Sequence, residues 1–83
     1  MSRLVDRPVE RLETGPGGGP RRFRALGRSW TVARVVEVWK DTGCWWAGEG
    51  EKVFFRLETA CGRLVELYRD LDAGKWFIYR VYD

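Results

Sequence analysis

Along most of the chain, apolar and polar residues alternate with a period of two, which is the pattern of a β-strand with one buried face. The alternation is clearest over residues 52–59, where Val53, Phe55 and Leu57 share one face. Strand-forming residues in similar patterns cover four further segments, namely residues 21–26, 29–39, 63–69 and 75–82. The sequence therefore predicts five strands, three of them in its C-terminal half.

Short turns with a glycine separate several of these segments, at Gly27, Gly62 and Gly74. Such turns join consecutive strands as hairpins, and Gly74 is expected where φ must be positive. Residues 75–82 are apolar on both faces and need cover on both sides. Because no helices are expected to make parallel crossovers, we predict an all-β fold. It is a small antiparallel meander of five to six strands, as a strongly coiled sheet or half-open barrel.

One of the five segments, residues 29–39, also fits a helix. Helical spacing occurs there at Val32, Val35, Val36 and Trp39. The valines and threonine of the segment favour a strand, and a bulge near Arg34 would account for the broken alternation. We therefore predict a strand and keep the helix as the alternative.

The first twenty residues are predicted to lead into a β domain that spans residues 21–83. Residues 7–14 alternate well enough for an edge strand, with Pro8 at its start, where a missing N–H is tolerated. Residues 15–20 read Gly-Pro-Gly-Gly-Gly-Pro, which predicts a loop or a flexible joint. Either this segment closes a wide hairpin or it is a disordered tether.

The size and composition of the chain fit one small domain with its own core. The chain has 83 residues, 45% of them hydrophobic, and five tryptophans give it large side chains to bury. Its two cysteines, Cys44 and Cys61, are expected to be reduced thiols. No apolar run is long enough for a membrane span or a signal peptide. We therefore expect a cytoplasmic protein that does not enter the membrane.

Histidine and the common catalytic and metal-binding motifs are missing. The chain has no histidine, no paired C-x-x-C motif and no phosphate-binding loop. Two pairs of acidic residues exist, Glu49 with Glu51 and Asp70 with Asp72, but both lie in predicted loops or turns, where acids are common. We therefore expect neither an enzyme nor a metal or other cofactor.

Charge is distributed unevenly along the chain. Residues 1–34 carry eight arginines against three acidic residues, a net charge of +5, whereas residues 35–83 have a net charge of −2. Guanidinium groups bind phosphate in a bidentate way, so a basic region can meet a nucleic acid. The candidate phosphate-binding residues are Arg21, Arg22, Arg24, Arg28 and Arg34. The alternative is an ordinary solvated face with acidic neighbours.

Aromatic residues form a second candidate constellation. The set comprises Trp45, Trp46, Phe54, Trp76, Phe77, Tyr79 and Tyr82. Aromatic rings on a β surface can stack unpaired bases, although most rings of so small a domain are expected in its core. Adjacent residues of an extended segment face opposite ways, so one of Trp45 and Trp46 is expected near the surface, and we take Trp46 as the candidate for base stacking.

Several spaced motifs together carry a family resemblance. They are Asp6-x-Pro8-Val9-Glu10, Arg22-Phe23-Arg24, Gly27-Arg28, Trp30-x-Val32, Trp45-Trp46, Glu66-Leu67-Tyr68-Arg69-Asp70, Gly74-x-Trp76 and Val81-Tyr82-Asp83. With them the chain resembles a small bacterial domain family of unknown function, whose members occur alone or associated with Y-family translesion DNA polymerases. The resemblance implies a DNA-damage-tolerance context and carries over no catalytic residue.

Two functional hypotheses follow. The first is an accessory module that binds nucleic acid, and the alternative is a protein-interaction module that docks on a polymerase or its partners. A continuous arginine face without acids would favour nucleic acid, whereas interleaved Glu37, Glu58 or Glu66 would count against it. A large exposed apolar patch would favour a protein partner.

Overall fold

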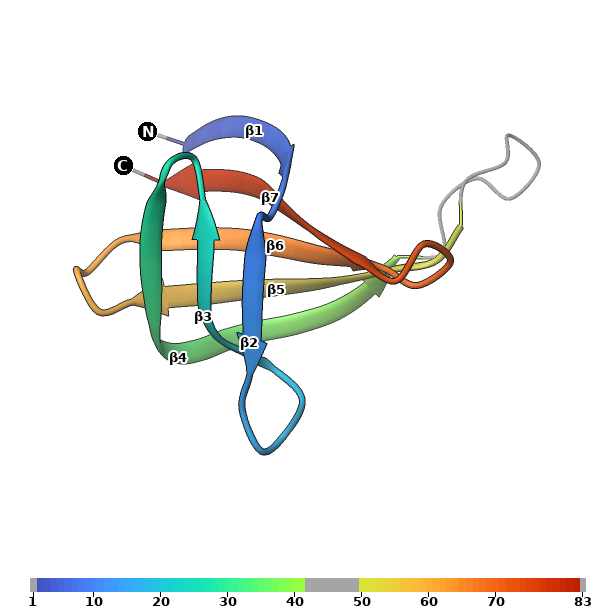
Figure 1. Ribbon diagram of the computed structural model, residues 1–83, viewed down its shortest axis with the longest axis horizontal. Helices are drawn as coiled ribbons and strands as arrows, with labels where there is room; N and C mark the ends of the chain where they lie inside the picture. Colours follow the sequence, from blue (N-terminus) through green and yellow to red (C-terminus); the bar gives the residue numbers. More distant parts are fainter. Residues whose placement is uncertain (1, 42–49, 83) are drawn as a thin grey trace.

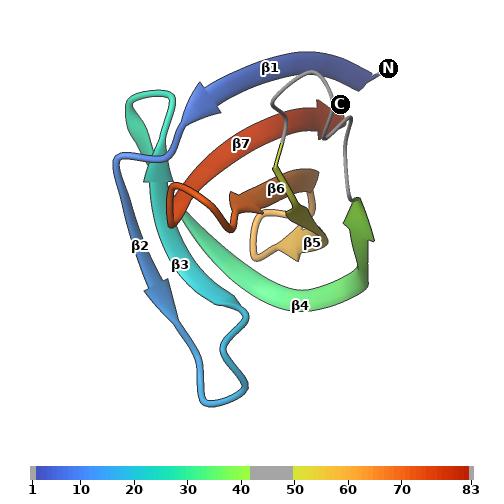
Figure 2. The same ribbon diagram turned by 90° about the vertical axis from the view of Figure 1, so that its right-hand side faces the viewer.

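The computed structural model describes residues 2–41 and 50–82. All regular secondary structure in these ranges is β-strand (Figure 1). The strands are β1 (Ser2–Pro8), β2 (Arg11–Thr14), β3 (Pro20–Ala25), β4 (Arg28–Asp41), β5 (Lys52–Thr59), β6 (Leu64–Asp70) and β7 (Lys75–Tyr82). They form one antiparallel sheet in the order β1-β7-β6-β5-β4-β3-β2, which coils into a half-barrel (Figure 2). The predicted all-β meander is therefore confirmed, with seven strands instead of five to six.

The ambiguous segment is a strand. β4 runs through it without a helical turn, pairing with β3 over its first residues and with β5 from Val32 onward. The register with β5 shifts twice, so that Ala33 and Val36 have no partner across the ladder. These two bulges explain the helix-like spacing, because each extra residue reverses the phase of the alternation.

The N-terminal segment differs from its prediction. Residues 7–14 do not form one strand, and Pro8 ends β1 instead of starting an edge strand. The chain bends at the next two residues: the Val9 N–H donates to the carbonyl of Trp76 in β7 at 3.0 Å, and the Glu10 N–H donates to the carbonyl of Arg24 in β3 at 2.8 Å. This bend joins the two ends of the sheet, so residues 2–14 help to close the half-barrel (Figure 2).

The core fills the inside of the coiled sheet. Its buried side chains are Phe23, Ala25, Trp30, Leu57, Val65, Leu67, Ile78 and Val81. The rings of Phe23 and Trp30 stack with their centroids 5.9 Å apart, and the indole N–H of Trp30 donates to the Ala25 carbonyl at 3.1 Å. The inward positions of β3, β5, β6 and β7 thus match the apolar positions of the sequence pattern.

The β3–β4 hairpin is closed by a two-residue turn at Leu26 and Gly27, whose φ angles are 55° and 73°. Two successive positive φ angles are typical of a type I′ turn, whose twist suits a hairpin. The predicted positive φ at Gly74 is also confirmed, at 67°.

A second cluster of aromatic rings lies on the outer face of the sheet. Trp39, Phe54, Tyr68 and Phe77 occupy facing positions on four successive strands, from β4 to β7. The rings of Tyr68 and Phe77 stack at 5.0 Å, and those of Trp39 and Phe54 at 5.4 Å. Phe54 and Tyr68 are buried there, outside the central core. The twist of the sheet and the neighbouring rings therefore protect a second apolar layer.

Candidate nucleic-acid interface

Three of the eight arginines in residues 1–34, namely Arg11, Arg22 and Arg24, meet on the outer face of β2 and β3, beside the start of β4. In the strand register, Arg11 faces Arg24 and Arg24 faces Ser29, while Glu13 faces Arg22 in the next row. Alternation along β3 explains this arrangement, because its inward positions hold buried apolar side chains and its outward ones hold arginine. Register therefore brings three guanidinium groups onto one outer surface.

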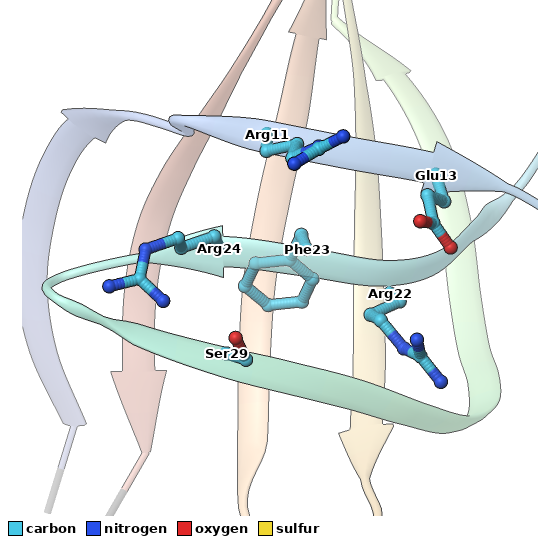
Figure 3. A pocket seen from close by; sticks show the side chains of 6 residues that line it. All are labelled: Arg11, Glu13, Arg22, Phe23, Arg24 and Ser29. Atoms are coloured by element: carbon cyan, nitrogen blue, oxygen red, sulfur yellow. The ribbon is translucent and has the colours of Figure 1, made fainter.

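These side chains line a shallow pocket of about 310 Å³. The lining residues are Arg11, Glu13, Arg22, Phe23, Arg24 and Ser29, and Figure 3 shows that they come from three adjacent strands. Phe23 also lines the pocket, although its ring is buried in the core on the inner face of the sheet. Such a pocket offers guanidinium and hydroxyl donors to one ligand, which is the donor set that binds phosphate oxygens.

The pocket contains a charge arrangement that opposes folding. Like charges placed directly across an antiparallel pair are destabilising, and Arg11 directly faces Arg24. The Arg24 Nε lies 3.2 Å from the Glu10 Oε2, but both side chains are about half exposed, at 51% and 55%. Within residues 2–41 and 50–82, neither Arg11 nor Arg22 makes an ion pair.

The five arginines singled out in the sequence do not share this surface. Arg22 and Arg24 line the pocket, whereas Arg21 and Arg34 line a different groove beside the glycine-rich segment. Arg28 lies at the far end of the β3–β4 hairpin, with its Cζ 4.1 Å from the centroid of the Trp30 ring. Adjacent residues of a strand face opposite ways, which separates Arg21 from its neighbour.

Acidic residues also interleave with the predicted set. The Arg34 Nε donates to the Glu58 Oε1 at 3.1 Å, so this arginine is already paired. Glu37 and Glu66 do not contact the predicted arginines, because both pair with Arg56. The candidate interface therefore narrows to the pocket. The stacking candidate, Trp46, lies outside the described residues.

Sequence reasoning missed two members of the pocket, Arg11 and Ser29. A hairpin register could have found Arg11. If β2 and β3 pair around the glycine-rich segment, Arg11 lies opposite Arg24. The sequence leaves open whether residues 15–20 close a wide hairpin, and Arg11 is missing from the candidate set because residues 7–14 are assigned to a lead.

A different charge pattern covers the outer face of β4 to β7. One row across these strands reads Glu37, Arg56, Glu66 and Arg80, with alternating sign. Glu66 is 3% exposed, and its Oε2 accepts hydrogen bonds from the Arg56 Nε at 3.0 Å and from the Tyr82 hydroxyl at 2.7 Å. The hydrogen bond to Glu66 raises the pKa of the Arg56 guanidinium above its ordinary value.

Tyr68 and Cys61 also have shifted pKa values. Burial, together with a hydrogen bond from its hydroxyl to the Asp6 Oδ1 at 2.7 Å, raises the pKa of Tyr68 well above its usual range. The Thr59 hydroxyl, 3.2 Å from the sulfur, lowers the pKa of the exposed Cys61 thiol, with a smaller contribution from the charge of Arg28. Neither residue lies in the arginine pocket.

The remaining chemistry of the described residues is sparse. No group of three or more Cys, Asp or Glu side chains in residues 2–41 and 50–82 is placed to hold a metal ion. The same part of the chain contains no helix long and apolar enough to cross a membrane.

The fold and this surface define a small antiparallel half-barrel with an arginine-lined pocket on its outer face. The chain belongs to the family described as domain of unknown function DUF6504, whose model matches residues 1–83. Neither the comparison with curated proteins nor the comparison with solved structures returned a match.

Proposed function

We propose that the domain is a non-enzymatic accessory module that binds nucleic acid through the arginine pocket of β2 and β3. The observation that carries the proposal is the pairing of Arg11 with Arg24 across the two strands, beside a third arginine, Arg22. A facing pair of like charges weakens the hairpin, so a bound anion that neutralises both would relieve the repulsion.

Phosphodiester groups suit this pocket better than a single small anion does. Arg11, Arg22 and Arg24 come from two adjacent strands, whose spacing is about 4.8 Å. Successive phosphates of a nucleic acid can therefore meet different guanidinium groups. The Arg24–Glu10 pair is half exposed and contributes about 1 kcal/mol or less, so a phosphate can compete with it.

The cellular context is part of the proposal. Y-family translesion polymerases, which the sequence resemblance implies as associates, act on DNA, so a small DNA-binding module would serve to hold a polymerase near its template. We propose a cytoplasmic location and DNA, with such a polymerase, as the first partners to test.

The decisive test is fluorescence anisotropy with labelled single-stranded and double-stranded DNA at 50 mM and 200 mM salt. About three phosphate contacts give a slope of roughly −2 to −3 for log K against log salt, so the affinity should fall about 20-fold or more over this range. The triple variant Arg11→Ala, Arg22→Ala, Arg24→Ala should remove the binding.

Arg63 supplies the matched control, because it is an exposed arginine in the turn between β5 and β6. Arg63→Ala loses one positive charge but leaves the pocket intact, so its affinity should stay within about twofold of the parent. Equal losses in Arg63→Ala and Arg11→Ala would show that net charge alone governs binding. No binding of either DNA at 50 mM salt would refute the proposed function.

A further inference from the structure

A second pocket adjoins the arginine pocket at the corner where β1 ends and β2 begins. It has a volume of about 420 Å³, and its apolar lining is formed by Trp76 of β7 together with Pro8, Val9 and Leu12. Arg11 lines both this corner pocket and the arginine pocket. The two pockets therefore open onto neighbouring parts of one surface.

Two backbone hydrogen bonds fix the corner pocket beside the arginines. The Val9 N–H donates to the carbonyl of Trp76 at 3.0 Å, and the Glu10 N–H donates to the carbonyl of Arg24 at 2.8 Å. Consecutive residues of one bend thus tie β7 to β3 (Figure 2). The strands that carry the Trp76 ring and the Arg24 guanidinium are therefore held together by the backbone.

The Trp76 ring is held from behind by the core. It is half-buried and packs against the core cluster, and its centroid lies 5.2 Å from that of the Phe55 ring. A ring that packing already holds loses little conformational freedom when it stacks on a ligand. The volume of the corner pocket lies within the range of small-molecule sites, about 300–1,000 Å³, so a flat ring the size of a nucleobase fits it.

Positive charges surround the Trp76 ring. Arg11 and Lys75 line the corner pocket, and the Arg69 Cζ lies 5.8 Å from the centroid of the Trp76 ring. None of these three cations forms an ion pair within residues 2–41 and 50–82. The acidic residue of the corner pocket, Glu10, already has an arginine partner. An aromatic ring among cations is the combination that binds single strands, since the ring stacks a base and the cations attract its phosphates.

We infer that the corner pocket takes an unpaired base of a single-stranded nucleic acid, which stacks on Trp76 while an adjoining phosphate meets Arg11 and Arg24. This inference rests on the proposed function and specifies its ligand as a single strand. The bases of a duplex are paired and stacked inside it, so none of them can reach the ring. Phosphate contacts alone would not favour the single strand, because the duplex has the higher charge density.

The test compares three labelled DNAs of about twelve nucleotides by fluorescence anisotropy at 50 mM salt. They are a thymidine strand, the same strand paired with its complement, and a strand with an abasic spacer at every position. The thymidine strand should bind at least about fivefold more tightly than the other two, because only its bases are free to stack.

The outcomes separate this inference from the proposed function. Equal affinities of the thymidine and abasic strands, both falling with salt, would overturn base stacking and leave the phosphate contacts of the arginine pocket standing. No binding of any of the three DNAs would refute the proposed function and this inference with it.

Protein variants locate the base. Trp76→Leu keeps an apolar side chain against the core but removes the flat ring, so affinity for the thymidine strand should fall at least about fivefold. Affinity for the abasic strand and the duplex should stay within about twofold. Trp39→Leu is the matched control: Trp39 is also half-buried, stacks on Phe54 at 5.4 Å and has the Arg56 Cζ 5.4 Å from its ring centroid, but it does not line the corner pocket. Equal losses in both variants would overturn the assignment to Trp76.

A measurement on the unaltered chain does not depend on how the variants fold. In the ¹⁵N-labelled chain, the indole N–H signal of Trp76 should shift far more with the thymidine strand than with the abasic strand. The amide signals of Arg11 and Arg24 should shift with both, because both strands carry phosphates. A Trp76 signal that stays in place at saturation, while the arginine signals move, would overturn the inference.

Discussion

The outer faces of two parts of the sheet differ in how facing charges are matched. Across β4 to β7, facing residues alternate in sign, in one row from Glu37 to Arg80 and in another that reads Asp41, Lys52, Asp70 and Lys75. Across β2 and β3, Glu13 faces Arg22, but in the next row Arg11 faces Arg24, a pair of like charges. Opposite charges across a ladder stabilise a sheet and like charges destabilise it.

The charges between β4 and β7 stabilise the fold, whereas the arginine pair has no such role, and we propose that it binds nucleic acid. The rows between β4 and β7 flank the aromatic row and hold a buried carboxylate, so their charges are part of the packing. The arginine pair is exposed, weakens its own hairpin and lines a pocket. A local arrangement that lowers the stability of the fold without improving its packing is expected at a functional site.

The largest expected effect on stability is at Glu66, in a row of alternating charges between β4 and β7. Glu66→Ala should lower the free energy of unfolding by about 2–3 kcal/mol, because it strips Arg56 and the Tyr82 hydroxyl of a buried partner while Arg56 keeps some access to water. Urea denaturation measures the change. Glu58→Ala, which breaks the exposed pair with Arg34, should cost less than about 1 kcal/mol. Equal losses in the two variants would contradict the distinction between the buried and exposed carboxylates.

Alkaline pH should weaken the aromatic row. The raised pKa of Tyr68 means that the folded state holds this proton more tightly than the unfolded state. The resulting stability is present below about pH 10, the ordinary tyrosine pKa, and is lost as pH rises further. Tyr68→Phe should cost about 1 kcal/mol at pH 8 through loss of the Asp6 hydrogen bond, and its stability should fall less between pH 9 and 11.

Thermal or urea unfolding across this pH range provides the measurement. Tyr79→Phe leaves the hydrogen bond to Asp6 in place and is the matched control, so its alkaline decline should follow that of the parent chain. Parallel pH curves for Tyr68→Phe and the parent would show that Tyr68 is not the titrating group.

A substitution in the arginine pair should change stability and DNA affinity in opposite directions. Arg11→Glu replaces a like-charge pair with an opposite-charge pair, so the free energy of unfolding should rise by about 0.2–1 kcal/mol. DNA affinity should fall at least about tenfold, since a phosphate then meets a carboxylate. Denaturation and anisotropy on the same sample measure both effects. A variant that loses stability together with binding would place Arg11 among the residues that serve the fold.

The smallest expected effect concerns the acid beside the pocket. Glu10→Gln removes the exposed partner of Arg24 and should change stability by less than about 0.5 kcal/mol. DNA affinity should rise about twofold to fivefold at 50 mM salt, because Arg24 becomes free and the local charge more positive. An unchanged affinity in anisotropy measurements would exclude competition between Glu10 and a phosphate.

Most of the fold could be predicted from local sequence patterns. The alternation over residues 52–59 and the glycine turns at Gly27 and Gly74 predicted strands and hairpins that the structure contains. The bounds of the N-terminal strands β1 and β2 could not be predicted in this way. Nothing local to Val9 and Glu10 says that their N–H groups bond to different strands, β7 and β3, so a corner between two strands looked like one strand.

The sequence by itself determined the class of fold, the hairpin turns and the presence of a basic N-terminal half, because periodicity, turn residues and charge are local properties. Only the tertiary structure decided which arginines share a surface and where the bend at Val9 and Glu10 closes the half-barrel. Both depend on register and on how far the sheet coils, and one residue of register, as at the two bulges of β4, moves every later side chain to the other face.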